Sequence, residues 1–150
     1  MIHYIIDGNN LIGKDSFLNK LQRKEKQSSR EKLSLILDRY FINKKANVTL
    51  HFDGYPNETI RSNKARVIYS ENRTADEKIK YQIEHLKSNK NTTVVTSDNN
   101  LAQFAKVCGC KVVTSEEFLK IIRDSKSGDD EEKRIKEISN QEILKLFKAK

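Results

Sequence analysis

Three aspartates each stand where an apolar stretch of the chain ends. They are Asp7, Asp53 and Asp98: the first two follow residues rich in Ile, Leu, Val or Phe, and Asp98 follows the β-branched stretch 92–96. Such stretches indicate buried strands, and the carboxyl ends of parallel strands meet at one edge of a sheet. Taken singly, each aspartate also has an ordinary explanation. Asp-Gly is a common turn pair after Asp7 and Asp53, and Asp98 is a favoured N-cap for the next helix.

A fourth aspartate, Asp76, stands in the first turn of an expected helix. Thr74 and Glu77 have the spacing of a capping box, and an apolar stripe follows from Ala75 to Leu86. The helix dipole favours acidic residues in a first turn, which is a structural explanation for Asp76. Because Thr74 and Glu77 already serve the cap, Asp76 is free to point elsewhere.

Hydrophobic periodicity predicts strands that alternate with helices. Strands are expected at 2–7, 48–54, 66–69, 92–96 and 111–114, and helices at 16–21, from 28 or 29 to 41, and from 75, 99 and 115 onward. A polar turn is expected directly after the first strand. This alternation predicts an α/β fold, a three-layer α/β/α sandwich with a mostly parallel sheet. In such sheets ligands bind beyond the carboxyl ends of the strands.

Particular residues mark where these helices begin and end. Ser28 or Ser29 is expected to cap the helix that continues to residue 41. Gly109 is expected to end the helix after Asp98 as its C′ residue. Thr114 and Glu117 form a second capping box.

The charge of the chain favours a polyanionic partner. The 150 residues carry 29 Lys and Arg against 21 Asp and Glu, a formal net charge of +8. Lys and Arg that neutralise phosphates release counterions, although a positive charge also serves solubility. The candidate phosphate contacts are Arg23, Lys24, Arg61, Lys64 and Arg73.

The length of the chain fits one domain, expected at 1–124, followed by a charged linker at 125–137 and an amphipathic helix at 138–150. That helix either docks on the domain or engages another protein. The apolar start is too short for a signal peptide or a membrane span, so a cytoplasmic protein is expected. Cys108 and Cys110 do not have the spacing of a redox pair or a zinc site, so both are expected as thiols. Nothing in the sequence indicates an oligomeric state.

Several carboxylates at one sheet edge repel one another, by about 4 kcal/mol for two unit charges about 4 Å apart at an effective dielectric of 20. A hard divalent ion, Mg²⁺ or Mn²⁺, offsets this repulsion and keeps positions open for water or phosphate oxygens. An acidic pocket in basic surroundings therefore suggests phosphodiester hydrolysis.

Four motifs in order resemble a known family, the NYN domains of the PIN-like nuclease superfamily, and within it the small bacterial YacP-like ribonucleases. The motifs span residues 6–12, 52–54, 74–79 and 95–98, and the resemblance covers roughly 1–124. It implies a PIN-like sheet and a metal-dependent endoribonuclease that acts on RNA, including mRNA at the ribosome. It further implies that Asp7, Asp76 and Asp98 ligate Mg²⁺ or Mn²⁺ and that Asn10 orients metal or phosphate.

The additional candidates for this site are Asp53, Glu77 and Asn100. Members of the family often carry another carboxylate shortly after the position of Asp98, where this chain has Asn99, Asn100 and Ala102. The missing carboxylate weakens a site for a second metal ion. It keeps open the alternative of an RNA-binding or ribosome-associated adaptor with a weak or inactive site.

Phosphoryl transfer to an aspartate, as in receiver domains or haloacid-dehalogenase-like phosphatases, is disfavoured. Those families have paired acids near the first strand and a lysine at a later strand end. Here Gly8 and Asn9 follow Asp7, and the last strand ends in Thr114.

Overall fold

A five-stranded parallel sheet forms the centre of the protein. The computed structural model describes residues 1–125, and the sheet order is β3-β2-β1-β4-β5. The apolar β1 (Ile2–Asp7) lies in the middle, between β2 (Ala46–Phe52) and β4 (Thr92–Val95). The outer strands are β3 (Ala65–Tyr69) and β5 (Lys111–Val113), and the pairings are parallel throughout. The expected α/β fold with a central first strand is confirmed.

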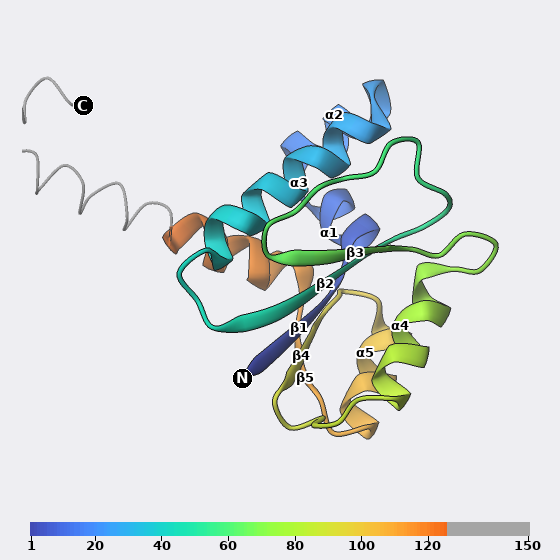
Figure 1. The fold of residues 1–150 in the computed structure, drawn as a ribbon, viewed down its shortest axis with the longest axis vertical. Helices are drawn as coiled ribbons and strands as arrows, with labels where there is room; N and C mark the ends of the chain where they lie inside the picture. The colour runs from blue at the N-terminus through green and yellow to red at the C-terminus, as the bar shows by residue number, and fades with distance from the viewer. Residues whose placement is uncertain (126–150) are drawn as a thin grey trace, which may run out of the picture. The chain divides into compact units, whose positions relative to one another are not determined.

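Helices cover both faces of this sheet, which gives three layers (Figure 1). One face carries α1 (Gly8–Lys14), α2 (Ser16–Lys24) and α3 (Lys26–Phe41), and the other carries α4 (Ala75–Glu84) and α5 (Asn99–Val107). Residues 115–125 are also helical.

Successive side chains of β1 point to opposite faces of the sheet and pack into the core on both sides. The ring centroid of Tyr4 lies 5.0 Å from that of Phe41 in α3, on the face that α1–α3 cover. Ile5 is fully buried on the opposite face, in a cluster with Ile79 and Ile83 of α4 and Leu101 of α5. Both faces of the central strand are therefore held by apolar packing, which fixes the position of its last residue, Asp7.

The predicted helix caps at three places are confirmed. Thr74 and Glu77 form the complete capping box of α4. Thr114 and Glu117 exchange the equivalent bonds at the helix of residues 115–125, at 2.9 and 3.0 Å. Gly109 has φ of +92° just after α5, the backbone conformation that favours glycine at C′.

Two expectations about helix starts were wrong. The chain does not turn after Asp7 but enters α1 at once, because the Asp7 carboxylate accepts from the backbone of Asn10 and caps the helix. The third helix begins before the expected serines, since Glu25 caps it by accepting from the backbone of Gln27 at 3.2 Å. Ser29 is instead buried and donates to the carbonyl of Leu18 at 2.8 Å.

The expected linker at 125–137, beyond its first residue, and the expected helix at 138–150 lie outside the described residues. Within residues 1–125, no helix combines the length and apolar character needed to cross a bilayer. Cys108 and Cys110 are free thiols.

Candidate functional site

Three of the predicted aspartates meet at the carboxyl edge of the sheet. Asp7 is the last residue of β1, Asp53 directly follows β2, and Asp98 follows β4 and caps α5 by accepting from the backbone of Leu101 at 3.1 Å. Strands β2, β1 and β4 are neighbours in the sheet. The three acids therefore stand side by side at one edge, as the sequence predicts.

Asp7 is the most strongly perturbed of the three acids. Burial is the main cause that raises the pKa of its carboxyl to about 6, and the negative charges of Asp53 and Asp98 add to the rise. Hydrogen bonds from the Thr96 hydroxyl, at 3.1 Å, and from the Asn10 backbone oppose it. In the part of the chain that the structure describes, no ion pair neutralises Asp7. The carboxylate is thus placed where its charge is unfavourable unless a cation joins it.

Thr96 links two of these acids and was not predicted from the sequence. It is fully buried, and its hydroxyl donates to Oδ2 of Asp7 while accepting from the backbone N–H of Asp98 at 3.1 Å. A single hydroxyl therefore fixes the position of Asp98 relative to Asp7.

Asp53 is held by backbone and side-chain contacts from three elements. Its N–H donates to Oδ1 of Asn9 at 2.6 Å, and its carbonyl accepts from the buried Arg30 guanidinium at 2.9 Å. Its carboxylate accepts from the N–H of Ala75, the first residue of α4, at 2.7 Å. This carboxylate thus joins the acid cluster to the start of α4, where the helix dipole favours negative charge.

Asp76 and Glu77 have local partners in α4. Asp76 pairs with Lys80 one turn later at 3.2 Å, and Glu77 is engaged in the capping box through the backbone N–H of Thr74 at 3.0 Å. The acids whose charges raise the pKa of Asp7 are Asp53 and Asp98. Electrostatically, Asp53 is therefore a closer neighbour of Asp7 than Asp76 is.

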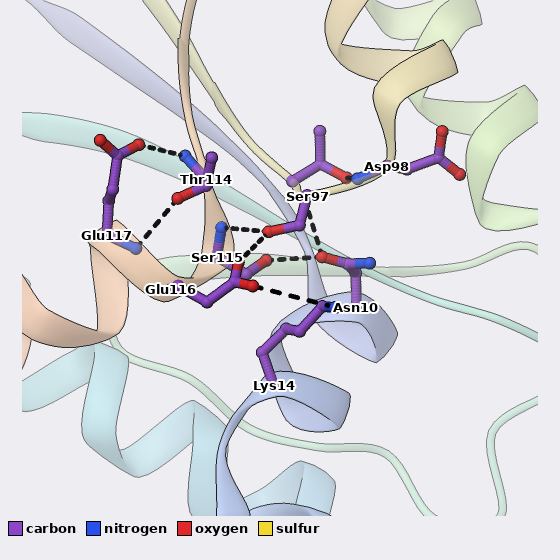
Figure 2. A network of polar contacts seen from close by, with 9 residues as sticks. Asn10, Lys14, Ser97, Asp98, Thr114, Ser115, Glu116 and Glu117 are labelled. Atoms are coloured by element: carbon purple, nitrogen blue, oxygen red, sulfur yellow. Dashed lines mark hydrogen bonds and ion pairs between the residues drawn. The ribbon is translucent and has the colours of Figure 1, made fainter.

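Asn10 lies at the centre of a polar network that Figure 2 shows. Its Oδ1 accepts from the backbone of Ser97 at 2.9 Å and from the hydroxyl of Ser115 at 2.7 Å. The Ser97 hydroxyl in turn donates to Glu116, which also lies 3.9 Å from the ammonium of Lys14. Asn10 thereby holds α1 against the segments that follow β4 and β5.

Sequence reasoning missed several members of this site. Ser115 and Glu116 follow β5 just as Asp98 follows β4, and this strand-end position was the available signal. Arg30 and Asn9 had no comparable signal, because their bonds to Asp53 join residues 23 and 44 positions apart.

The predicted phosphate-contact residues divide between the two edges of the sheet. Arg73 directly precedes the capping box of α4, on the side of Asp53, and Arg23 and Lys24 are exposed at the end of α2. Lys64 precedes β3 at the opposite edge, and its ammonium donates to the carbonyl of Lys44 at 3.1 Å. The two other predicted residues, Arg61 in the loop before β3 and Asn100 in the first turn of α5, are exposed.

The donor set at the carboxyl edge fits a hard divalent ion in its chemistry. Among residues 1–125 no group of three or more His, Cys, Asp or Glu side chains is already arranged around one point. Mg²⁺ does not require such a group, since it is commonly bound through one or two carboxylates and completes its shell with waters and substrate phosphates. Asp7 and Asp98, joined through Thr96, meet that smaller requirement.

Comparison with known families identifies the type of domain. The family model for the YacP-like NYN domain matches residues 4–148. The chain therefore belongs to the YacP-like NYN domain family. This is a nuclease-type domain family, and the predicted resemblance is confirmed.

Solved structures show the same fold as this NYN domain. A crystal structure of Rae1 (YacP) from Bacillus subtilis, as a W164L mutant, is 23% identical with a TM-score of 0.76, covering 99% of this chain and 92% of that one. A second Rae1 (YacP) structure from the same organism is 24% identical with a TM-score of 0.69, covering 99% and 93%. No curated protein matches the chain.

Proposed function

We propose that this NYN domain is a divalent-metal-dependent endoribonuclease that hydrolyses RNA phosphodiester bonds. The observation that carries the proposal is the partly buried Asp7 carboxylate at the end of the central strand, whose pKa is raised to about 6 by desolvation and by the charges of Asp53 and Asp98. Placing like charges together at a strand edge is costly, and a site that binds a cation recovers that cost. Membership of a nuclease-type family supports the proposed nuclease activity.

Asp7, Asp76 and Asp98 are the proposed ligands of Mg²⁺ or Mn²⁺, with Asp53 as a further carboxylate beside them. A bound ion would supply a water of lowered pKa and would neutralise charge that develops on the phosphate. Thr96 keeps Asp7 and Asp98 in a fixed relation through its two hydrogen bonds. Asp76 pairs with Lys80 through Oδ2, so its Oδ1 is the oxygen proposed for the ion.

The basic groups at the carboxyl edge are the proposed RNA contacts. The start of α3 lies at this edge, because Arg30 reaches the carbonyl of Asp53 from it, and α2 ends directly before α3. Arg23 and Lys24 therefore stand on the same side of the sheet as the acids, and Arg73 flanks the start of α4. Lys64 is at the opposite edge and is not included.

The assay for this function is cleavage of a mixed RNA pool with and without Mn²⁺, comparing the wild type with Asp98→Asn. We expect cleavage by the wild type only when the metal is present, and at least a hundredfold less by the variant. An enzyme that cleaves equally well after chelation, or with Asn at position 98, contradicts the proposal.

A second candidate function is an RNA-binding adaptor, including one that acts at the ribosome. It is favoured by Asn99 and Asn100 after Asp98, where members of the family often carry another carboxylate. In the same assay it predicts salt-sensitive RNA binding with no cleavage in any divalent ion.

A further inference from the structure

A cavity of about 670 Å³ lies between α4 and the sheet, apart from the acid cluster. Its sheet side includes His3 of β1, His51 of β2 and Arg66 of β3, and its helix side includes Lys78, Tyr81 and Gln82. We call it the α4 cavity. Its volume is within the range of pockets that bind small molecules.

The electrostatic character of the α4 cavity is opposite to that of the carboxyl edge. No Asp or Glu is among its lining residues, whereas Arg66, Lys78 and Lys87 contribute cationic side chains. The pKa of both His3 and His51 is lowered, mainly by burial and further by the positive charge of Arg66. The positive charge of the cavity wall therefore disfavours protonation of His3 and His51, and the same charge would attract an anion.

A chain of hydrogen bonds fixes the polar floor of the cavity. His51 Nε2 lies 2.7 Å from Gln82 Oε1, Gln82 Nε2 donates to the Thr49 hydroxyl at 3.0 Å, and that hydroxyl lies 3.0 Å from His3 Nε2. Because an amide oxygen only accepts, the Nε2 of His51 donates to Gln82 Oε1. The half-buried His3 ends this chain of polar side chains.

His51 adds an unpartnered acceptor to this floor: with its hydrogen on Nε2, its Nδ1 can accept from a ligand N–H or O–H but does not itself contact a phosphate oxygen. Its side chain is 1% exposed, and its Nδ1 has no hydrogen-bond partner among the described residues. Buried polar atoms without a partner are uncommon in folded proteins and call for an explanation.

The rim of the cavity offers an aromatic surface. Tyr81 is 55% exposed, and its ring stacks on that of His85 with centroids 4.2 Å apart. Both residues line the cavity. Exposed aromatic rings next to cationic groups are the usual means by which proteins hold an unpaired base and its phosphate.

We infer that the α4 cavity binds a nucleoside phosphate, with the phosphate at Arg66 and Lys78 and the base against Tyr81. The nucleotide is either a free mononucleotide or one residue of a single-stranded RNA. None of Asp7, Asp53, Asp76 and Asp98 lines the cavity, so the inference stands whether or not the domain cleaves RNA.

The test is calorimetric titration of the full chain in EDTA, which removes any metal ion from the carboxyl edge. The titrants are a nucleoside 5′-monophosphate, inorganic phosphate and a short single-stranded oligoribonucleotide. We expect the double variant Arg66→Gln/Lys78→Gln to weaken nucleotide binding at least tenfold. The matched control, Lys106→Gln/Lys111→Gln, removes the same charge from exposed positions outside the cavity and should retain wild-type affinity.

Tyr81→Ala tests the assignment of the base. This variant should bind the nucleotide several-fold more weakly and should bind inorganic phosphate with unchanged affinity. Tight binding of the oligoribonucleotide with weak binding of the mononucleotide identifies an RNA strand as the source, and the reverse identifies a free nucleotide. Failure of every titrant to bind, or equal losses in the two double variants, overturns the inference. Because cleavage is not measured, this failure is distinct from failure of the proposed ribonuclease function.

Discussion

At the scale of single residues, the site depends on a partly buried carboxylate held close to other negative charges. Asp7 is held at the end of the central strand by apolar packing on both faces of the sheet, and the charges of Asp53 and Asp98 act on it. Thr96 and Asn10 limit the cost by donating to its two carboxylate oxygens. The position of this carboxylate is therefore set by the fold, and its energetics favour a cation.

The Thr96 hydroxyl can be removed with little change in shape. We expect Thr96→Val to destabilise the fold by about 1–2 kcal/mol, the range for a buried hydrogen bond that loses one partner. We also expect it to reduce RNA cleavage about tenfold, equivalent to about 1.4 kcal/mol of transition-state free energy. Thr96→Ser should restore cleavage. Thr93→Val, in the buried strand β4 that directly precedes Thr96, is the control, and equal activity losses at positions 93 and 96 would show that Thr96 has no special role.

His51 should make the stability of the fold depend on pH. Burial, its main perturbation, lowers its pKa to about 4. As pH falls below about 6.5, His51 is protonated in the unfolded chain before it is protonated in the folded chain. The contribution of neutral His51 to the free energy of unfolding is therefore complete above about pH 6.5 and is lost as pH falls towards 4.

For a pKa shift of this size, His51 lowers the free energy of unfolding by about 2 kcal/mol between pH 7.5 and pH 5. Urea unfolding at the two values should show that His51→Gln reduces the loss by this amount. Identical pH dependence in the two proteins would mean that His51 is not the group responsible.

At the scale of elements, α1 determines how the acid cluster is built. The chain enters α1 immediately after Asp7, and Asn9 and Asn10 on this helix bind the segments that follow β2, β4 and β5. The close approach of α1 to β2 requires Gly8, since a Cβ there would lie 2.6 Å from the backbone oxygen of His51 and from the ring of Phe52.

We expect Gly8→Ala to destabilise the fold by about 1–3 kcal/mol, the usual cost of overpacking, and to lower cleavage by shifting Asp7. Gly13 lies on the same helix, and a Cβ added there meets nothing within 4 Å. Gly13→Ala should therefore be neutral or stabilise by up to about 1 kcal/mol. Thermal unfolding of the two variants measures the difference, and equal effects would refute the packing argument.

Local sequence signals predicted these elements well where the signal lies within a few residues. The capping boxes at Thr74 and Thr114 and the C′ glycine at 109 are examples. The start of α1 was missed because Asp-Gly has the same appearance as a turn and as a helix cap. In the structure Asp7 caps the helix, and Gly8 lets the first turn pack against β2, more than forty residues away.

At the scale of the whole molecule, the sequence predicted the sheet edge on which the acids gather, because each acid directly follows an apolar strand. It did not predict the contacts that join distant parts of the chain, such as Arg30 with the carbonyl of Asp53. It also gave no sign of the α4 cavity, which depends on how α4 lies over the sheet. Among residues 1–125, basic groups lie both beside the acidic edge and in a separate cavity.

The basic groups beside the acidic edge should govern the salt dependence of RNA binding. Replacing Arg23 and Lys24 by Gln should lower the magnitude of the slope of log affinity against log salt by up to about 1.4, since each phosphate contact on a single strand contributes about 0.7. The Lys106→Gln/Lys111→Gln variant should keep the wild-type slope. Equal slopes for all three proteins would remove Arg23 and Lys24 from the RNA-binding surface.

The most direct test of the central claim is RNA cleavage by wild type and Asp7→Asn across a Mg²⁺ titration. The substitution removes a partly buried charge and keeps the shape of the side chain, so the fold should be retained or stabilised. We predict that the wild type gains activity as Mg²⁺ rises, while Asp7→Asn remains at the background rate at every concentration and stays folded. Undiminished, metal-dependent cleavage by a folded Asp7→Asn protein would contradict the account.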